Sequence, residues 1–117
     1  DSIEKAVQAL QGQKKGGILV QVFHADDKDK PLAKLITNDI LMRPLVRYYA
    51  KQLQVVKLDY AEHKDALDAL GVTETPALLI LKKDGKRKTI LQGPKQIKLR
   101  KVMAGLKSVA PNRKKPW

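Results

Sequence analysis

The sequence predicts an α/β fold in which one mixed four-stranded sheet is covered by helices on both faces. Helix and strand patterns alternate along the 117 residues in the order αβαβαββα. Residues 18–23 are apolar and β-branched almost throughout, which is typical of a strand buried on both faces. Near the end, Asp84-Gly85 separates two strand patterns and predicts a tight hairpin. These observations favour two strand–helix–strand units with a parallel pair of strands, closed by an antiparallel hairpin.

The first predicted helix covers residues 3–11, where apolar side chains recur on one face. Asp1 or Ser2 can cap its N-terminus, and Gly12 begins the polar stretch that ends it. The buried strand 18–23 follows. We therefore expect a helix, a turn and a core strand at the start of the chain, before a polar loop.

A long helical pattern covers residues 32–52, and we expect a break near Asn38 and Asp39. Asp39 could cap a second segment. Pro44 lies five residues further on, where proline kinks a helix unless it falls in the first turn. The pattern thus favours two helical segments.

Three further strands and two helices are expected in the second half of the chain: strands at 55–60, 77–81 and 88–92, and helices at 62–70 and 95–109. Gly71 is expected as the glycine just beyond the shorter helix, and Pro111 ends the longer one. Neither an internal repeat nor an interdomain linker is evident. We therefore expect a single domain at residues 1–109, followed by a basic C-terminal tail at residues 110–117.

Several motifs in this order resemble those of the thioredoxin-like fold family. The most specific lies in residues 70–81, where Gly71-Val72 and then Thr75-Pro76 precede an apolar strand. The resemblance implies that Pro76 follows a cis peptide bond, although the residues alone would also permit a trans proline at a strand start. In this family the groove beside that proline binds polypeptides, which implies a groove at His24, Thr75, Pro76 and Gly93.

The remaining matches extend the resemblance over about residues 15–109. Residues 17–23 resemble the first core strand of the family, and residues 56–59 resemble the second, which commonly ends in aspartate. Residues 83–86 resemble the hairpin turn. The long helical stretch 32–52 resembles relatives with an extended helix after the active-site loop.

The chain departs from this family at the residues that carry its chemistry. Thiol–disulfide exchange needs a thiolate and a second, resolving thiol, and the sequence contains no cysteine. Val22 stands where a buried acid is usual and His24 where tryptophan is usual. Composition excludes disulfide exchange, disulfide scaffolds and cysteine-based metal sites, so the resemblance implies a redox-inactive member.

Other catalytic groups are sparse, and we do not expect an enzyme. His24 and His63 are the only histidines, and Asp26, Asp27 and Asp29 near His24 match no zinc or calcium spacing. The chain has no glycine-rich phosphate loop, and its two serines have no histidine partner in a recognisable triad motif. The sequence therefore predicts no catalytic residue, no metal site and no cofactor.

The excess of positive over negative charge is confined to the last third of the chain. Residues 1–81 hold 11 basic and 11 acidic side chains, whereas residues 82–117 hold 13 basic side chains and one acid, which accounts for the net charge of +12. Such segregation indicates a surface for an anionic partner, with a solubility device or an unstructured basic end as the alternative. The candidate polyanion-binding residues are Lys82, Lys83, Lys86, Arg87, Lys88, Lys95, Lys98, Arg100, Lys101, Lys107, Arg113, Lys114 and Lys115.

Our leading hypothesis is a redox-inactive binding or interaction module that uses the groove, or this basic face for an anionic partner, to hold a protein or a polyanion. One alternative is a protein that binds nucleic acid or a heparin-like polyanion through the hairpin and last helix. Base stacking is not favoured, because Trp117 is the only aromatic residue of the basic third. Another alternative is a structural or assembly domain of a larger protein.

The sequence says little about the compartment. No apolar run is long enough to span a membrane. The chain starts at Asp1 without a methionine or an apolar leader, which favours a processed or excised product and leans towards export. The basic end would equally suit a nucleic-acid setting.

Overall fold

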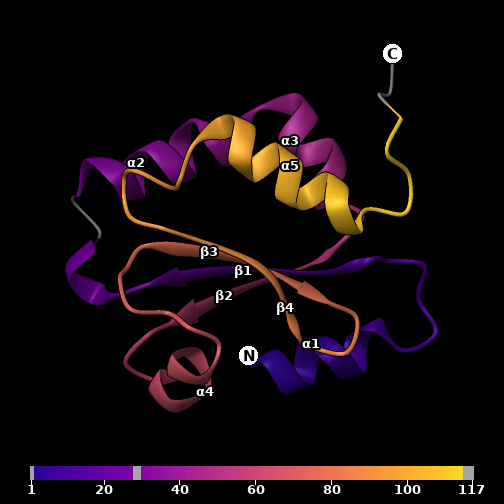
Figure 1. The fold of residues 1–117 in the computed structure, drawn as a ribbon, viewed down its shortest axis with the longest axis horizontal. Helices are drawn as coiled ribbons and strands as arrows, with labels where there is room; N and C mark the ends of the chain where they lie inside the picture. Colours follow the sequence, from indigo (N-terminus) through magenta and orange to yellow (C-terminus); the bar gives the residue numbers. More distant parts are fainter. Residues whose placement is uncertain (1, 28–29, 115–117) are drawn as a thin grey trace.

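A computed structural model describes residues 2–27 and 30–114 of the chain (Figure 1). Each apolar run becomes a strand and each amphipathic run a helix. The elements in chain order are α1 (Ile3–Leu10), β1 (Gly17–Phe23), α2 (Pro31–Asn38), α3 (Pro44–Ala50), β2 (Gln54–Asp59), α4 (Lys64–Ala69), β3 (Ala77–Lys82), β4 (Arg87–Gln92) and α5 (Leu99–Val109). Two single-turn 3₁₀ helices, Ala25–Asp27 and Ile40–Met42, flank α2. None of the helices in the described residues is long and apolar enough to cross a membrane.

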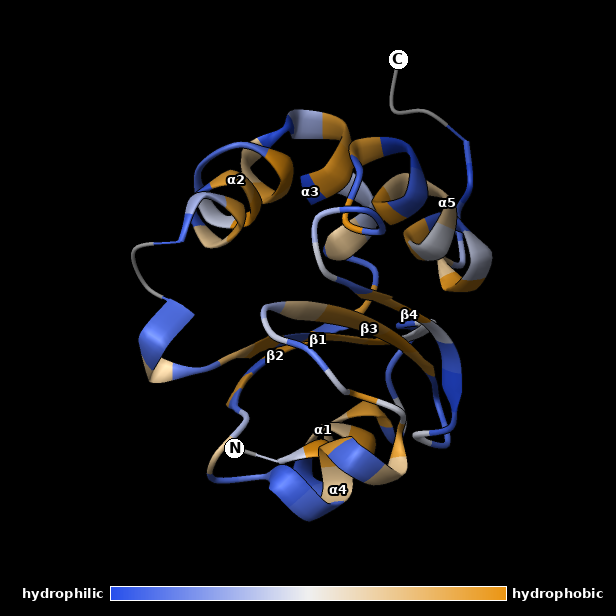
Figure 2. Ribbon diagram, turned by 60° about the vertical axis from the view of Figure 1, so that its left-hand side comes forward, coloured by the Kyte–Doolittle hydropathy of each residue, from blue (hydrophilic) through white to orange (hydrophobic). Residues whose placement is uncertain are grey.

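The four strands form one mixed sheet in the order β2-β1-β3-β4. β1 runs parallel to β2, and β3 runs antiparallel to both β1 and β4. Figure 2 shows the strands side by side, with α1 and α4 on one face and α2, α3 and α5 on the other. The predicted three-layer α/β/α sandwich with a mixed four-stranded sheet is therefore confirmed.

Alternating side chains of the central strands build two separate cores. Ile18, Val20 and Val22 of β1 pack towards α1 and α4, whereas Leu19 packs towards α2, α3 and α5. In β3, the buried run Ala77–Leu81 divides in the same way between the two faces. A strand with both faces covered needs apolar residues at every position, which explains the continuous apolar runs in the sequence.

The interrupted helix 32–52 has the predicted break, with α2 ending at Asn38 and α3 starting at Pro44. Pro44 occupies the first turn of α3, where proline's missing N–H costs no helical bond. The expected capping role of Asp39 is wrong. Its carboxylate makes no cap and instead accepts a hydrogen bond from Arg43 Nε at 2.9 Å.

The last helix begins at Leu99, four residues later than predicted. Gly93, with φ +78°, turns the chain sharply after β4, and the Ile97 amide donates to the Gly93 carbonyl. Ile97 is 1% exposed and fills the core beneath α2 and α5 before the helix starts. The predicted early turn of the helix is thus replaced by a loop that buries an apolar side chain.

The short helix α4 ends just before Gly71, the glycine expected to follow it. Gly71 adopts a left-handed conformation with φ +97°. Its amide donates to the Asp68 carbonyl, and the Val72 amide donates to the Leu67 carbonyl, so two helix-end carbonyls find partners. This turn aims the following segment, 72–76, at the end of the sheet where the candidate groove lies.

Candidate binding groove

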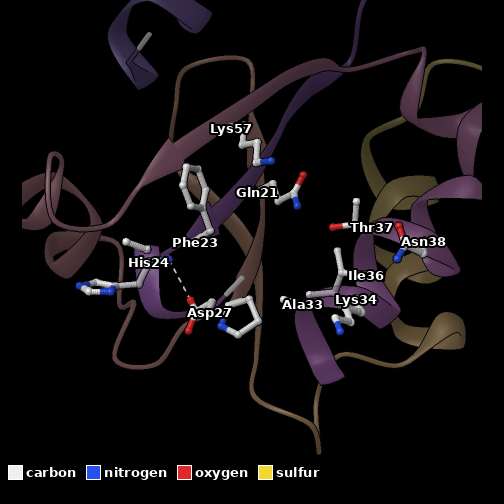
Figure 3. A pocket seen from close by; sticks show the side chains of 12 residues that line it. Gln21, Phe23, His24, Asp27, Ala33, Lys34, Ile36, Thr37, Asn38 and Lys57 are labelled. Carbon is white, nitrogen blue, oxygen red and sulfur yellow. Dashed lines mark hydrogen bonds between the residues drawn. The ribbon is translucent and has the colours of Figure 1, made fainter. Parts of the chain in front are cut away.

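A groove of about 690 Å³ lies beside Pro76, between the ends of β1 and β2 and one side of α2 (Figure 3). The Thr75–Pro76 peptide bond is cis. The walls of the groove combine apolar, amide, hydroxyl and charged side chains: Gln21, Phe23, His24, Ala25, Asp27, Ala33, Lys34, Ile36, Thr37, Asn38, Lys57 and Pro76. A mixed lining of this kind suits a ligand with both apolar and hydrogen-bonding groups.

Gln21 and Lys57 bring polar groups to the sheet side of the groove. They lie opposite each other in the parallel register of β1 and β2. In Figure 3 the Gln21 amide and the Lys57 ammonium group extend into the space that Thr37 of α2 faces from the other side. Lys57 Nζ also lies 5.1 Å from the centre of the Phe23 ring, a cation–π contact that orients this side chain.

Asp27 fixes the loop between β1 and α2. Its carboxylate is 1% exposed, and Oδ2 accepts a hydrogen bond from the His24 amide at 2.8 Å. Oδ1 lies 2.7 Å from Lys30 Nζ, an ion pair without hydrogen-bond geometry. Lys30 immediately precedes α2, so this pair ties the end of the sheet to the start of the helix.

The surroundings of Asp27 favour its charged form. Burial alone would raise the pKa of Asp27, but the Lys30 ammonium group, the Thr75 hydroxyl and the His24 amide together hold that pKa below its ordinary value of 3.8. The carboxylate in turn raises the pKa of Lys30 above its usual value. Asp27 is therefore an anion that stabilises the loop, and it is not a proton donor at neutral pH.

His24 lines the groove but does not face its polar centre. In Figure 3 its imidazole points away from Gln21 and Lys57. Nδ1 lies 3.3 Å from the Asp26 amide, which donates to it, and 3.6 Å from Asp26 Oδ2. His24 thus borders the groove, and its Nδ1 accepts a hydrogen bond within the local turn.

The residues predicted around Pro76 do not all meet in the groove. Thr75 is half-buried beside Pro76, and its backbone N–H and C=O have no hydrogen-bond partner among the described residues. Gly93 is buried and does not line the groove, because the Glu74 carboxylate lies against it: a Cβ added to Gly93 would be 2.7 Å from Glu74 Oε2.

Gln92 holds the segment before Pro76. Its Oε1 accepts hydrogen bonds from the amides of Thr73 and Glu74 at 2.8 and 3.1 Å. Its Nε2 donates to the Gly71 carbonyl at 3.3 Å. One side chain from β4 therefore positions the chain from Gly71 to Glu74, and through it Thr75 at the groove rim.

The candidate basic residues are spread over both helical layers. The hairpin turn lies against α1, because a Cβ added to Gly85 would be 3.1 Å from Val7 Cγ2. α5 lies on the opposite face of the sheet (Figure 1). The structure therefore separates Lys83 and Lys86 of the turn from Arg100 and Lys101 of the helix.

Three of the candidate basic side chains make internal contacts. Arg87 Nη1 donates to the Leu70 carbonyl at 3.0 Å, and Arg113 Nη2 donates to the Ser108 carbonyl at 3.3 Å. Lys107 Nζ lies 5.5 Å from the centre of the Tyr49 ring. Most of the remaining candidates are exposed without an ion pair in the described part of the chain: Lys82, Lys83, Lys86, Lys88, Lys95, Lys98, Arg100, Lys101 and Lys114. Asp1, Asp29, Lys115 and Trp117 lie outside the described residues.

Sequence reasoning missed most of the groove lining, notably Gln21, Lys34, Thr37 and Lys57. A signal for Gln21 was present, since it is the one polar residue in the apolar run of β1. The position of Lys57 depends on the register between two strands, which no local pattern encodes. Among the described residues, no group of three acidic, histidine or cysteine side chains could hold a metal ion.

Comparisons with known proteins place the fold. No protein-family model matches the sequence, and a search of curated proteins found no match. Among solved structures, the reduced C-terminal domain of DsbD from Neisseria meningitidis is similar, with a TM-score of 0.69, 18% identity and coverage of 92% of this chain and 93% of that one. Thioredoxin f2 from Chlamydomonas reinhardtii has a TM-score of 0.65 and 14% identity, covering 96% and 95% of the two chains.

A third similar structure is a disulphide isomerase from Xylella fastidiosa, with a TM-score of 0.61 and 21% identity over 92% of this chain and 85% of that one. At these identities the likeness establishes the fold. The absence of cysteine leaves no thiol for the loop after β1 or for any other position. The chain therefore has a thioredoxin-like fold that lacks the paired cysteines of redox-active members, and thiol-based redox catalysis is not available to it.

Proposed function

We propose that this chain is a redox-inactive interaction module that binds a polypeptide segment in the groove beside Pro76. The observation that carries the proposal is the groove itself, whose lining mixes apolar and hydrogen-bonding groups in a chain with no thiol. A groove of this size is large enough to enclose several side chains of a bound segment.

The backbone N–H and C=O of Thr75, which have no partner among the described residues, suggest how the segment binds. An extended polypeptide laid along the rim could donate to the Thr75 carbonyl and accept from the Thr75 amide, as in strand addition. Lys34 and Lys57 add positive charge to the lining. An acidic side chain on the partner would be attracted to them, so an anionic polypeptide is the preferred occupant.

The test is a variant that fills the groove. Peptides selected for binding to the wild-type protein should lose at least tenfold in affinity for Ala33→Trp, because Ala33 lines the groove and a large ring would occupy it. Ala104→Trp, on the exposed surface of α5, is the matched control and should bind normally. Equal binding by both variants would refute the groove as the site, and thiol-dependent reduction of insulin by the pure protein would refute redox inactivity.

A second candidate function is binding of a nucleic acid or another polyanion. It is supported by exposed lysines and arginines on β3, β4 and α5 that have no ion pair among the described residues. If roughly six to eight of these side chains neutralise phosphates, the logarithm of affinity should fall with the logarithm of salt concentration at a slope near −5 to −7. Titration against heparin and a short duplex at several salt concentrations measures this slope, and a flat slope would make the charge a solubility feature.

A further inference from the structure

A second groove, of about 530 Å³, lies on the outer side of β2, away from Pro76. Its floor is aliphatic, and the described residues that line it include three cations and no carboxylate: Lys15, Leu19, Leu41, Arg47, Ala50, Lys51, Leu53, Gln54 and Val55. The cations come from the loop before β1 and from the end of α3. They lie in the part of the sequence whose net charge is zero, so only the fold gathers them.

These cations have no acidic partner in the described part of the chain. The four ion pairs found there involve His24, Lys30, Arg43 and Lys64, and none involves this groove. Arg47 and Lys51 also lie at the C-terminal end of α3, where positive charge stabilises a helix. Lys15 lies outside that helix, so helix stabilisation does not explain its place beside the groove.

The adjoining strand is an open edge. Among the described residues, β2 is the outermost strand on its side of the sheet, so every second residue there leaves its backbone N–H and C=O without a ladder partner. Val55 is 53% exposed, which is high for an aliphatic side chain, and Lys57, two residues further, is also exposed on this edge. Residues two apart on a strand share a face, so Val55 and Lys57 point to the same side as the groove.

We propose that the β2 edge binds an extended acidic polypeptide segment. An aliphatic residue of this segment lies opposite Val55, and the residues two positions before and two positions after it carry carboxylates. The edge supplies backbone hydrogen bonds, Val55 and the groove floor bury the aliphatic side chain, and the lining cations Lys15, Arg47 and Lys51 meet the carboxylates. Nucleic acid fits less well, because the described residues of the lining include no aromatic side chain that can stack on a base. Lys57 lines the groove beside Pro76, so Val55 and the three lining cations are the residues that distinguish this site from that groove.

The probe is a blocked peptide, Thr-Glu-Thr-Val-Thr-Glu-Thr, titrated into nitrogen-15-labelled protein and followed by NMR. Shift changes should concentrate on β2 and the end of α3. The peptide with lysine for glutamate, and the peptide with serine for valine, should each bind about tenfold more weakly or not at all. A response centred on Pro76 would overturn the proposal.

Charge reversal of Lys15, Arg47 and Lys51 to glutamate should weaken peptide binding roughly tenfold. The matched control, Lys83→Glu, Lys86→Glu and Lys101→Glu, changes net charge equally on distant exposed surfaces and should have less than a twofold effect. Equal weakening by both triple variants would show diffuse attraction and overturn the proposal. If the first triple variant fails to fold, Lys15→Glu alone should still weaken binding, and unchanged affinity for this folded variant would count against the site.

Discussion

At the scale of single residues, the loop after β1 is held in place by charged groups. Asp27 is buried at the end of this loop, and its carboxylate is bound by the His24 amide and the Lys30 ammonium group. A buried anion is stable only with such partners, because burial alone favours the neutral acid. The loop conformation therefore depends on the ionisation of one side chain.

Replacing that side chain tests the dependence. Because the pKa of Asp27 in the folded protein lies below 3.8, its charge stabilises the fold above that pH, and this contribution is lost as the pH falls through the folded pKa. Asp27→Asn should lower the free energy of unfolding at neutral pH by about 1–2 kcal/mol. It should also make stability fall less between neutral pH and pH 3 than in the wild type, as measured by urea denaturation.

The exposed Glu62→Gln serves as the control and should change neither value by more than about 0.5 kcal/mol. If Asp27→Asn unfolds with the wild-type pH dependence, the ion pair does not stabilise the fold.

Gly16 lies against the C-terminal end of α5. A Cβ added there would lie 1.7 Å from the Val109 carbonyl oxygen, so that the end of α5 would have to move. We expect Gly16→Ala to cost about 2–3 kcal/mol of stability in chemical denaturation, within the range of overpacking substitutions. Gln13→Ala, at a nearby exposed position, should be neutral, and a neutral Gly16→Ala would contradict this packing.

At the scale of elements, α4 is a helix of six residues whose C-terminal end is held from another part of the chain. Arg87 of β4 donates to the Leu70 carbonyl, and Gln92 donates to the Gly71 carbonyl. A helix this short is unstable by itself, so these contacts and its buried Leu67 maintain it. The same Arg87 is a candidate polyanion contact, and the structure gives it a second, local role.

Removing the Arg87 guanidinium group separates the two roles. Arg87→Met should lower stability by about 1 kcal/mol and reduce hydrogen-exchange protection at the end of α4, because the Leu70 carbonyl loses its partner. Lys88→Met removes the same charge from the neighbouring position and should leave the protection of α4 unchanged. Equal protection in both variants would show that Arg87 does not hold the helix.

Most elements could be predicted from local patterns, and the errors have physical causes. Buried strands, the Asp84-Gly85 turn and Gly71 follow from hydrophobic runs and turn chemistry that a few neighbouring residues determine. The start of α5 could not be predicted, because burial of Ile97 overrides the helical pattern of residues 95–98. Likewise, the Asp39 carboxylate pairs with Arg43, one turn further on, and this hydrogen bond competes with capping of the helix.

The grooves could be predicted least, because they arise from contacts between distant segments. Gln21 and Lys57 meet only through the register of β1 and β2. Lys15 and Lys51 reach one groove from segments separated by a strand and two helices. Sequence patterns report periodicity within an element, and they carry no information on which elements become neighbours.

At the scale of the whole molecule, the described part of residues 110–117 contacts the helical layer. Ala110 is 5% exposed, and the Tyr49 hydroxyl donates to the Arg113 carbonyl at 2.8 Å. The Asn112 amide donates to Gln52 Oε1, and its side-chain amide donates to the Tyr48 hydroxyl. The segment after α5 therefore packs on α3 in addition to carrying charge.

A chain that ends at Val109 should be less stable by about 2–3 kcal/mol, because it loses these hydrogen bonds and leaves the buried Tyr49 hydroxyl without a partner. Thermal denaturation measures the loss. The full-length double variant Arg113→Gln and Lys114→Gln keeps the backbone contacts and should retain most of the stability. If the shortened chain were as stable as the wild type, the packing of this segment would be contradicted. The double variant keeps the packing and removes two charges, so it is the better probe of charge in polyanion binding.

The missing thiols also decide how a partner can be captured. Proteins that exchange disulfides can be trapped with their substrates as mixed disulfides, a route closed to a chain without cysteine. The grooves offer a substitute, since Lys34 and Lys57 line one, and Lys15 and Lys51 line the other. Amine-reactive cross-linkers would therefore attach to a bound polypeptide at the site itself, and mass spectrometry of the linked lysine would report which groove held it.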